Sequence, residues 1–145
     1  MAELINRREN RQSVKGHMLP AFLLPETNIR GAGDGPVLDL GETDAELLVL
    51  TLGITRIIEQ ESLDVSIWGS ADGNEWGTKP LVSFPQKFYC GTYQVLLDIS
   101  AKPGTRYLRV KYGAQRWGKG DSKPLFTFYV FAQELHEQVL AMGAA

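Results

Sequence analysis

The sequence contains few of the residues that catalysis and metal binding use most. Its 145 residues include one cysteine and two histidines. His17 and His136 lie near opposite ends of the chain, and neither has the spacing of a zinc site. Cys90 cannot form an internal disulfide, and we expect a buried or half-buried structural thiol. We therefore predict no catalytic residue, no cofactor and no metal site, and we expect that the protein is not an enzyme.

Long apolar runs are also missing. The most hydrophobic run, residues 47–52, is far shorter than the ~20 residues that a membrane helix needs. Residues 1–17 are polar and lack the apolar core of a secretory signal. The net charge of −2 gives no overall basic excess for nucleic acid. We expect cytoplasmic synthesis without a signal peptide, no membrane and no nucleic-acid partner, and a place in a virion or virion-like particle is compatible with this.

Residues 63–76, LDVSIWGSADGNEW, organise the rest of the chain. Apolar and polar residues alternate from Leu63 to Trp68, which is the period of a half-buried strand. The following stretch from Ser70 to Asn74 is rich in residues that reverse a chain. This stretch predicts an antiparallel strand that runs into a tight turn.

Short strand patterns separated by turn signals continue along the chain, without a βαβ rhythm. They predict an all-β fold, an antiparallel β-sandwich or jelly roll of about eight strands. We divide the chain into a polar N-terminal arm (1–17), a β-sandwich domain (18–135) and a C-terminal tail (136–145) with a short helix expected over 134–142. The expected strands cover 18–24, 37–40, 45–58, 63–68, 81–84, 92–99, 107–113 and 125–132.

Three of these segments have features of their own. Gly53 predicts a bend or bulge within 45–58. Residues 114–123 are polar and contain glycine, and we expect a loop that carries Trp117. Residues 125–132 are apolar on both faces, which predicts a central strand covered on both sides.

The acidic residues of the turn raise the question of calcium. Asp64, Asp72, Asn74 and Glu75 supply oxygen ligands, but their spacing does not match an EF-hand loop. A polar hairpin turn explains the same residues, because Asp and Asn side chains bond nearby backbone groups. We favour the turn.

Aromatic residues are the stronger candidates for binding. A sugar-stacking platform or an interface hot spot is one interpretation, and filling of the sandwich core is the other. Trp117 is the best candidate for a contact residue, since Arg116 and Lys119 flank it in a hydrophilic stretch. The residues considered are Trp68, Trp76, Tyr89, Tyr93 and Trp117.

Charge is unevenly distributed along the chain. Residues 26–64 contain nine acidic residues against Arg30 and Arg56, and residues 106–123 contain six basic residues against Asp121. Opposite segments of neighbouring copies can attract one another, which favours a homo-oligomer or contacts with other particle subunits. Solvated or internally paired charges are the alternative. The interface candidates are Arg7, Arg8, Arg11, Arg116, Trp117, Lys119 and Lys123.

Residues 45–133 resemble small β-sandwich structural proteins of tailed phages, in which S-x-D-G-x-x-W is followed by R-Y-x-R and F-x-F-x-V. The resemblance implies a non-enzymatic structural subunit, such as a head-decoration or head–tail protein, that self-assembles or joins a larger particle. The matching residues are Ser70, Asp72, Gly73, Trp76, Arg106, Tyr107, Arg109, Phe126, Phe128 and Val130.

The motifs S-x-D-G-x-x-W and R-Y-x-R-V are also similar to those of discoidin-like (coagulation factor 5/8 type C) modules. That resemblance implies an alternative function, carbohydrate or lipid head-group binding through exposed loops. The chain lacks the bracketing cysteine pair of that family, since Cys90 is its one cysteine. A glycan is therefore a second candidate partner.

Overall fold

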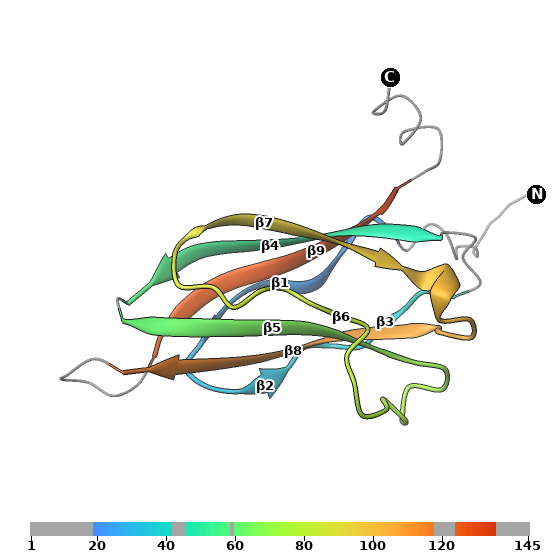
Figure 1. Ribbon diagram of the computed structural model, residues 1–145, viewed down its shortest axis with the longest axis horizontal. Helices are drawn as coiled ribbons and strands as arrows, with labels where there is room; N and C mark the ends of the chain where they lie inside the picture. Colours follow the sequence, from blue (N-terminus) through green and yellow to red (C-terminus); the bar gives the residue numbers. More distant parts are fainter. Residues whose placement is uncertain (1–18, 42–45, 59, 118–123, 136–145) are drawn as a thin grey trace, which may run out of the picture.

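The computed structural model describes residues 19–41, 46–58, 60–117 and 124–135, which form two antiparallel β-sheets packed face to face (Figure 1). One short 3-10 helix, Ile99–Ala101, follows the seventh strand. The strands are β1 (Ala21–Ile29), β2 (Gly33–Asp34), β3 (Leu38–Asp39), β4 (Leu47–Ile57), β5 (Glu61–Ser70), β6 (Val82–Ser83), β7 (Gly91–Asp98), β8 (Tyr107–Arg116) and β9 (Phe126–Leu135).

The strand order is that of a jelly roll. The four-stranded sheet runs β1-β9-β4-β7, and the five-stranded sheet runs β2-β8-β5-β6, with β3 also paired to β8. β2 and β3 both pair with β8 and act as two halves of one interrupted strand. The predicted all-β sandwich of about eight strands is confirmed.

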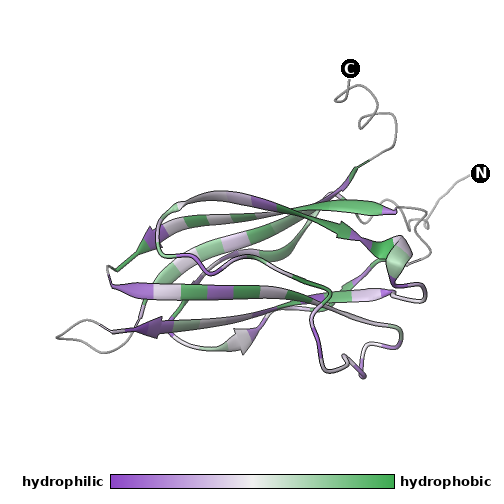
Figure 2. Ribbon diagram, viewed as in Figure 1, coloured by the Kyte–Doolittle hydropathy of each residue, from purple (hydrophilic) through white to green (hydrophobic). Residues whose placement is uncertain are grey.

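Alternating residues of both sheets fill the space between them. Leu48, Leu50 and Leu52 of β4 are almost completely buried, and so are Leu63 and Ile67 of β5. Figure 2 shows the matching alternation of hydrophobic and hydrophilic positions along these strands. Burial of each such side chain contributes about 1.5–3 kcal/mol, so this inner layer is the main source of stability.

Several strands are longer than the sequence predicts. β1 continues past Pro25 to Ile29, because a register shift between Leu24 and Thr27 takes the proline out of the regular ladder with β9. β8 continues to Arg116 because β5 pairs with it over its whole length, so the first part of the expected loop 114–123 is strand.

Two predictions near the chain's exposed parts are wrong. Glu134 and Leu135, where a helix was expected to begin, belong to β9 because they pair with β4. Cys90 is exposed rather than buried, because it lies in the connection to β7 and not on an inward-facing position. The N-terminal arm (1–17) and residues 136–145 lie outside the described residues.

β9 is central in its sheet, between β1 and β4, as predicted. Its inward-facing Phe126, Phe128 and Val130 are fully buried. Its outward-facing Tyr129 and Phe131 are half-buried, and no described element packs over them, so the predicted cover on both sides is not met in the described part of the chain. The described residues of the chain include no helix that is long and apolar enough to cross a membrane.

Candidate functional site

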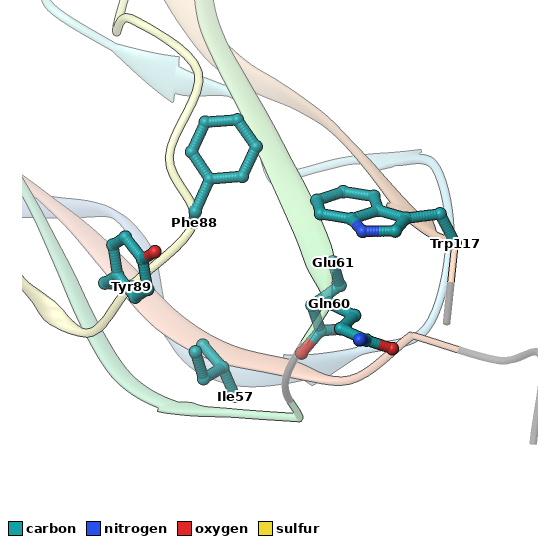
Figure 3. Close-up of a pocket in the computed structure, with 6 residues that line it drawn as sticks. All are labelled: Ile57, Gln60, Glu61, Phe88, Tyr89 and Trp117. Carbon is teal, nitrogen blue, oxygen red and sulfur yellow. The ribbon is translucent and has the colours of Figure 1, made fainter. Parts of the chain in front are cut away.

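An open cavity of about 570 Å³ lies at one end of the sandwich (Figure 3). The turn between β4 and β5, the connection from β6 to β7 and the end of β8 all contribute to its walls. The lining residues are Ile57, Gln60, Glu61, Phe88, Tyr89 and Trp117. We call this cavity the aromatic pocket.

Trp117 forms one wall of the aromatic pocket. It follows β8 directly, and its backbone N–H donates to the carbonyl of Gln60 at 3.1 Å. Its side chain is 60% exposed, and its ring meets that of Phe88 edge-to-face at a centroid distance of 5.9 Å. The structure thus places the strongest aromatic candidate of the sequence in a cavity, with a fixed backbone and an exposed ring.

The opposite wall is held by backbone hydrogen bonds. Leu63 and Lys87 exchange N–H···O bonds of 2.8 and 3.0 Å, which attach the connection before β7 to β5. The Tyr93 hydroxyl donates to the carbonyl of Tyr89 at 3.0 Å. Phe88 and Tyr89 are therefore presented by an anchored segment, although both rings are exposed.

Glu61 lies at the base of the pocket and is 1% exposed. One carboxylate oxygen accepts from the N–H of Leu125 at 2.7 Å, and the other accepts from the N–H of Ile58. The carboxylate thereby ties the β4–β5 turn to the start of β9. Because both oxygens accept from backbone donors, Glu61 holds these two segments together at the base of the pocket.

The pocket offers flat rings and an amide, which is chemistry for binding. Gln60, exposed and at a positive φ of 64°, lines the same pocket as Trp117. Of the sequence-predicted interface residues, Arg116 and Trp117 lie together at the end of β8. The other five, Arg7, Arg8, Arg11, Lys119 and Lys123, lie outside the described residues. Phe88, Gln60 and Glu61 were not predicted, and only the neighbouring pair Phe88–Tyr89 gave a sequence signal.

The remaining tryptophans lie on the outer face of the five-stranded sheet, neither in the core nor in the pocket. Lys111 Nζ lies 4.2 Å from the Trp68 ring centroid, and the Arg109 guanidinium lies 5.0 Å from that of Trp76. The Trp68 indole also donates to Ser66 Oγ at 2.9 Å. Each of these cation–π contacts covers one face of its ring, which reduces the surface on which a sugar could stack.

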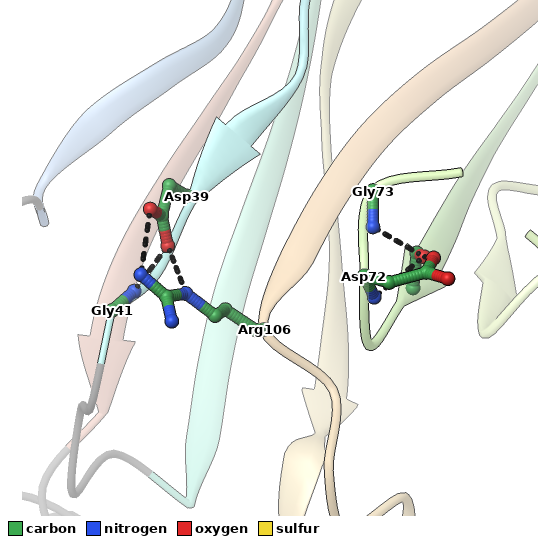
Figure 4. Close-up of polar contacts among 6 residues, drawn as sticks. Asp39, Gly41, Asp72, Gly73 and Arg106 are labelled. Carbon is green, nitrogen blue, oxygen red and sulfur yellow. Dashed lines mark hydrogen bonds and ion pairs between the residues drawn. The ribbon is translucent and has the colours of Figure 1, made fainter. Parts of the chain in front are cut away.

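Hydrogen bonds from backbone N–H groups to side chains hold the acidic turn after β5 in place (Figure 4). Asp72 accepts from the N–H groups of Asn74 and Glu75 at 2.8 and 2.9 Å. Both bonds lower the pKa of Asp72, and the bond from Glu75 has the larger effect. Ser70 Oγ accepts from the N–H of Gly73 at 2.8 Å. In the described ranges no group of three or more His, Cys, Asp or Glu side chains could hold a metal ion.

Asp39 and Arg106 join the acidic and basic segments within one chain (Figure 4). Arg106 Nε lies 2.9 Å from Asp39 Oδ1, and a second guanidinium nitrogen donates to Oδ2 at 3.2 Å. The hydrogen bond from Arg106 lowers the pKa of Asp39, and the N–H of Gly41 adds to this. Part of the charge asymmetry seen in the sequence is therefore paired internally.

A second surface lies on the outside of the four-stranded sheet. Phe22 packs edge-to-face against Tyr129 and Phe131 at centroid distances of 5.8 and 4.9 Å. Val49 and Leu96 are register partners on the neighbouring strands β4 and β7. Phe22 and Leu96 are 50% and 55% exposed. We call these five residues the outer apolar face; the apolar outward positions of 125–132 were its sequence signal.

No family model matches the sequence, and the curated proteins give no match. Among solved structures, the chain is similar to the K3 and K1 cleaved adhesin domains of Lys-gingipain from Porphyromonas gingivalis W83. The K3 domain has 15% identity and a TM-score of 0.43, with 77% of this chain and 66% of that one covered. The K1 domain has 16% identity and a TM-score of 0.40, with 78% and 66% covered. The chain thus spans just under two thirds of the length of each structure.

Proposed function

We propose that the chain is a non-enzymatic structural subunit, which self-assembles or decorates a larger particle through protein–protein contacts. The outer apolar face is the observation that carries this proposal. Phe22 leaves half of its surface in water beside the half-buried rings of Tyr129 and Phe131, and Leu96, which is 55% exposed, lies beside Val49 of β4. Contiguous apolar patches on soluble proteins mark interaction surfaces, because leaving them hydrated costs free energy.

The architecture supports a particle as the setting. Jelly rolls form viral capsid domains as well as lectin domains. The resemblance of residues 45–133 to tailed-phage structural proteins favours the first of these uses, and a phage-like virion or virion-derived assembly is the particle we propose. Both points are analogies of fold, whereas the apolar face is a property of this chain.

The test is the mass of the full chain in solution, measured by size-exclusion chromatography with light scattering over a wide concentration range. Cys90 is exposed, so a reducing agent must be present to exclude disulfide-linked dimers. We expect a concentration-dependent oligomer. A strict monomer at the highest concentration would contradict self-assembly.

Glycan binding is the second candidate, and the aromatic pocket favours it. Trp117, Phe88 and Tyr89 offer exposed ring faces, and Gln60 offers an amide beside them. Sugar rings present apolar faces to aromatic side chains and hydroxyl groups to amides, which is the combination that this pocket supplies.

Tryptophan fluorescence can isolate this pocket. In a Trp68→Phe, Trp76→Phe background, Trp117 is the remaining tryptophan. A sugar that binds in the pocket should change its emission, and Trp117→Ala in the wild-type background should remove the same sugar from a glycan array. A blank array for the wild type, or a Trp117→Ala variant that binds as before, would reject this candidate.

A further inference from the structure

We propose that the outer apolar face is covered in solution by the same face of a second copy of this chain, in a closed dimer with two-fold symmetry. This inference rests on the proposed function and names the partner. The four strands β1, β9, β4 and β7 form the face (Figure 1). Its features limit what can cover it.

The first feature is the absence of charge from the centre of the face. Register pairs Thr51 with Phe131 on one side and with Gln94 on the other, and it pairs Gln133 with Val49, so the residues at the centre of the face are uncharged. Charged residues lie at its edges: Asp98 follows two residues after Leu96 on the same side of β7, and the Glu26 carboxylate accepts from Thr55 Oγ1 at 2.7 Å. Over the uncharged centre, a charged partner surface would lose its hydration without gaining a counter-ion, so the part of the partner that covers the centre must also be uncharged.

The second feature is close packing within the face. The Tyr129 ring lies over the backbone of Gly53, where a side chain would otherwise project, and Phe22 packs edge-on against this ring. The aromatic side chains therefore fill the face between neighbouring strands. Two sheet faces of this kind pack about 10 Å apart in β-sandwiches, and a second copy offers an identical one.

The third feature is area. The sheet is about 19 Å wide at about 4.8 Å per strand, and Leu47 to Gly53 extend about 24 Å, giving about 450 Å² per copy. Two copies would bury about 900–1,000 Å², which lies at the lower limit for specific interfaces. A reversible dimer is the expected result, in contrast to an obligate one.

Copies of the chain could also associate in an open stack, but the charged residues on the five-stranded sheet disfavour this arrangement. A stack would press the outer apolar face onto the outer face of the next copy's five-stranded sheet. Arg109, Lys111 and Asp64 lie on strands β8 and β5 of that sheet, and Lys111 and Arg109 are held there against Trp68 and Trp76. Burying these cations against apolar side chains is costly, whereas face-to-face pairing buries none of them.

Sedimentation equilibrium of the full chain under reducing conditions tests the proposal. Leu96→Lys on edge strand β7 and Phe22→Lys on edge strand β1 each place a charge in the face at a position exposed by half or more. We expect each to weaken dimerisation at least about 100-fold, with circular dichroism and melting temperature near those of the wild type. Val37→Lys, at an apolar position that is 45% exposed between β2 and β3 of the other sheet, is the matched control and should dimerise as before.

The alternative outcomes separate this inference from the proposed function. If both lysine variants form oligomers as the wild type does, the inference is wrong, and the chain assembles through another surface. If the wild type forms species larger than a dimer and Leu96→Lys abolishes them, the face supports an open stack and the closed dimer is wrong. A wild-type chain that stays monomeric up to about millimolar concentration would overturn both.

Discussion

A Cβ atom on Gly53 would lie 2.1 Å from Cζ of Tyr129, so the tyrosine ring of β9 occupies the space above the backbone of β4. Gly53→Ala must displace this ring. We expect a loss of about 1–3 kcal/mol in the free energy of unfolding, since overpacking outweighs the better strand propensity of alanine. Urea denaturation measures it.

Gly113→Ala is the matched control for this substitution, because nothing lies within 4 Å of its Cβ position in β8. It should be neutral, or stabilising by about 0.5–1 kcal/mol, since glycine in a strand is costly. Equal stabilities of the two alanine variants would show that the contact between Gly53 and Tyr129 does not constrain the sheet.

Glu61→Gln should destabilise the domain by about 1–3 kcal/mol. The amide oxygen can accept from one of the two backbone N–H donors, but the amide nitrogen cannot accept from the other. The donors are the N–H groups of Ile58 and Leu125. Chemical denaturation gives the value, with Glu75→Gln at an exposed position as the control. A loss no larger than that of the control would mean that water replaces the carboxylate.

Asp39→Asn should show a pH-dependent effect on stability. The pKa of Asp39 is lowered in the folded state, so its contribution is present above the unfolded value of about 3.9 and is lost as pH falls through the folded pKa below it. The pair is half exposed, so we expect only about 0.2–1 kcal/mol at pH 7.

Urea denaturation of the wild type and Asp39→Asn from pH 7 down to about pH 2.5 measures this difference, which should shrink as pH falls through the folded pKa. Asp34→Asn, at an exposed position in β2, is the control. A difference that stays constant across this range would rule out the ion pair with Arg106 as its source.

Ser70→Ala should lower the free energy of unfolding by about 0.5–1.5 kcal/mol, because the hydroxyl accepts from the N–H groups of Gly73 and Asp72 at 2.8 and 3.2 Å. Water can replace the hydroxyl only in part. Thermal unfolding compared with Ser83→Ala, at an exposed position in β6, isolates this effect. Identical melting temperatures would show that the Asp72 carboxylate alone holds the turn.

Local patterns were sufficient to predict every described strand except β2, which has two residues, one of them a glycine. The alternation in β5 and β7 has the period of the pleat. The pair Pro103–Gly104 is typical of a type II turn, and Gly104 has the positive φ of 90° that such a turn requires. Strand ends were less predictable, because pairing partners far along the chain extend β1 and β8 beyond their own sequence signals.

The site was only partly predictable. Trp117 stands out because an aromatic residue in a basic, polar stretch has little reason to be buried. Its companions Phe88 and Gln60 come from other connections, and only the three-dimensional fold brings them together. Glu61 has the sequence context of a surface turn, and its burial depends on the N–H of Leu125, 64 residues away.

The pairing of β1 with β9 has a consequence for how the protein is made. β9 lies between β1 and β4, so the middle of the four-stranded sheet is the last part of the described chain to be synthesised. Until β9 arrives, β4 has an unpaired edge and β1 has no strand to join. Completion of this sheet is thus a late and non-local step, which slows folding and leaves the nascent chain prone to aggregation.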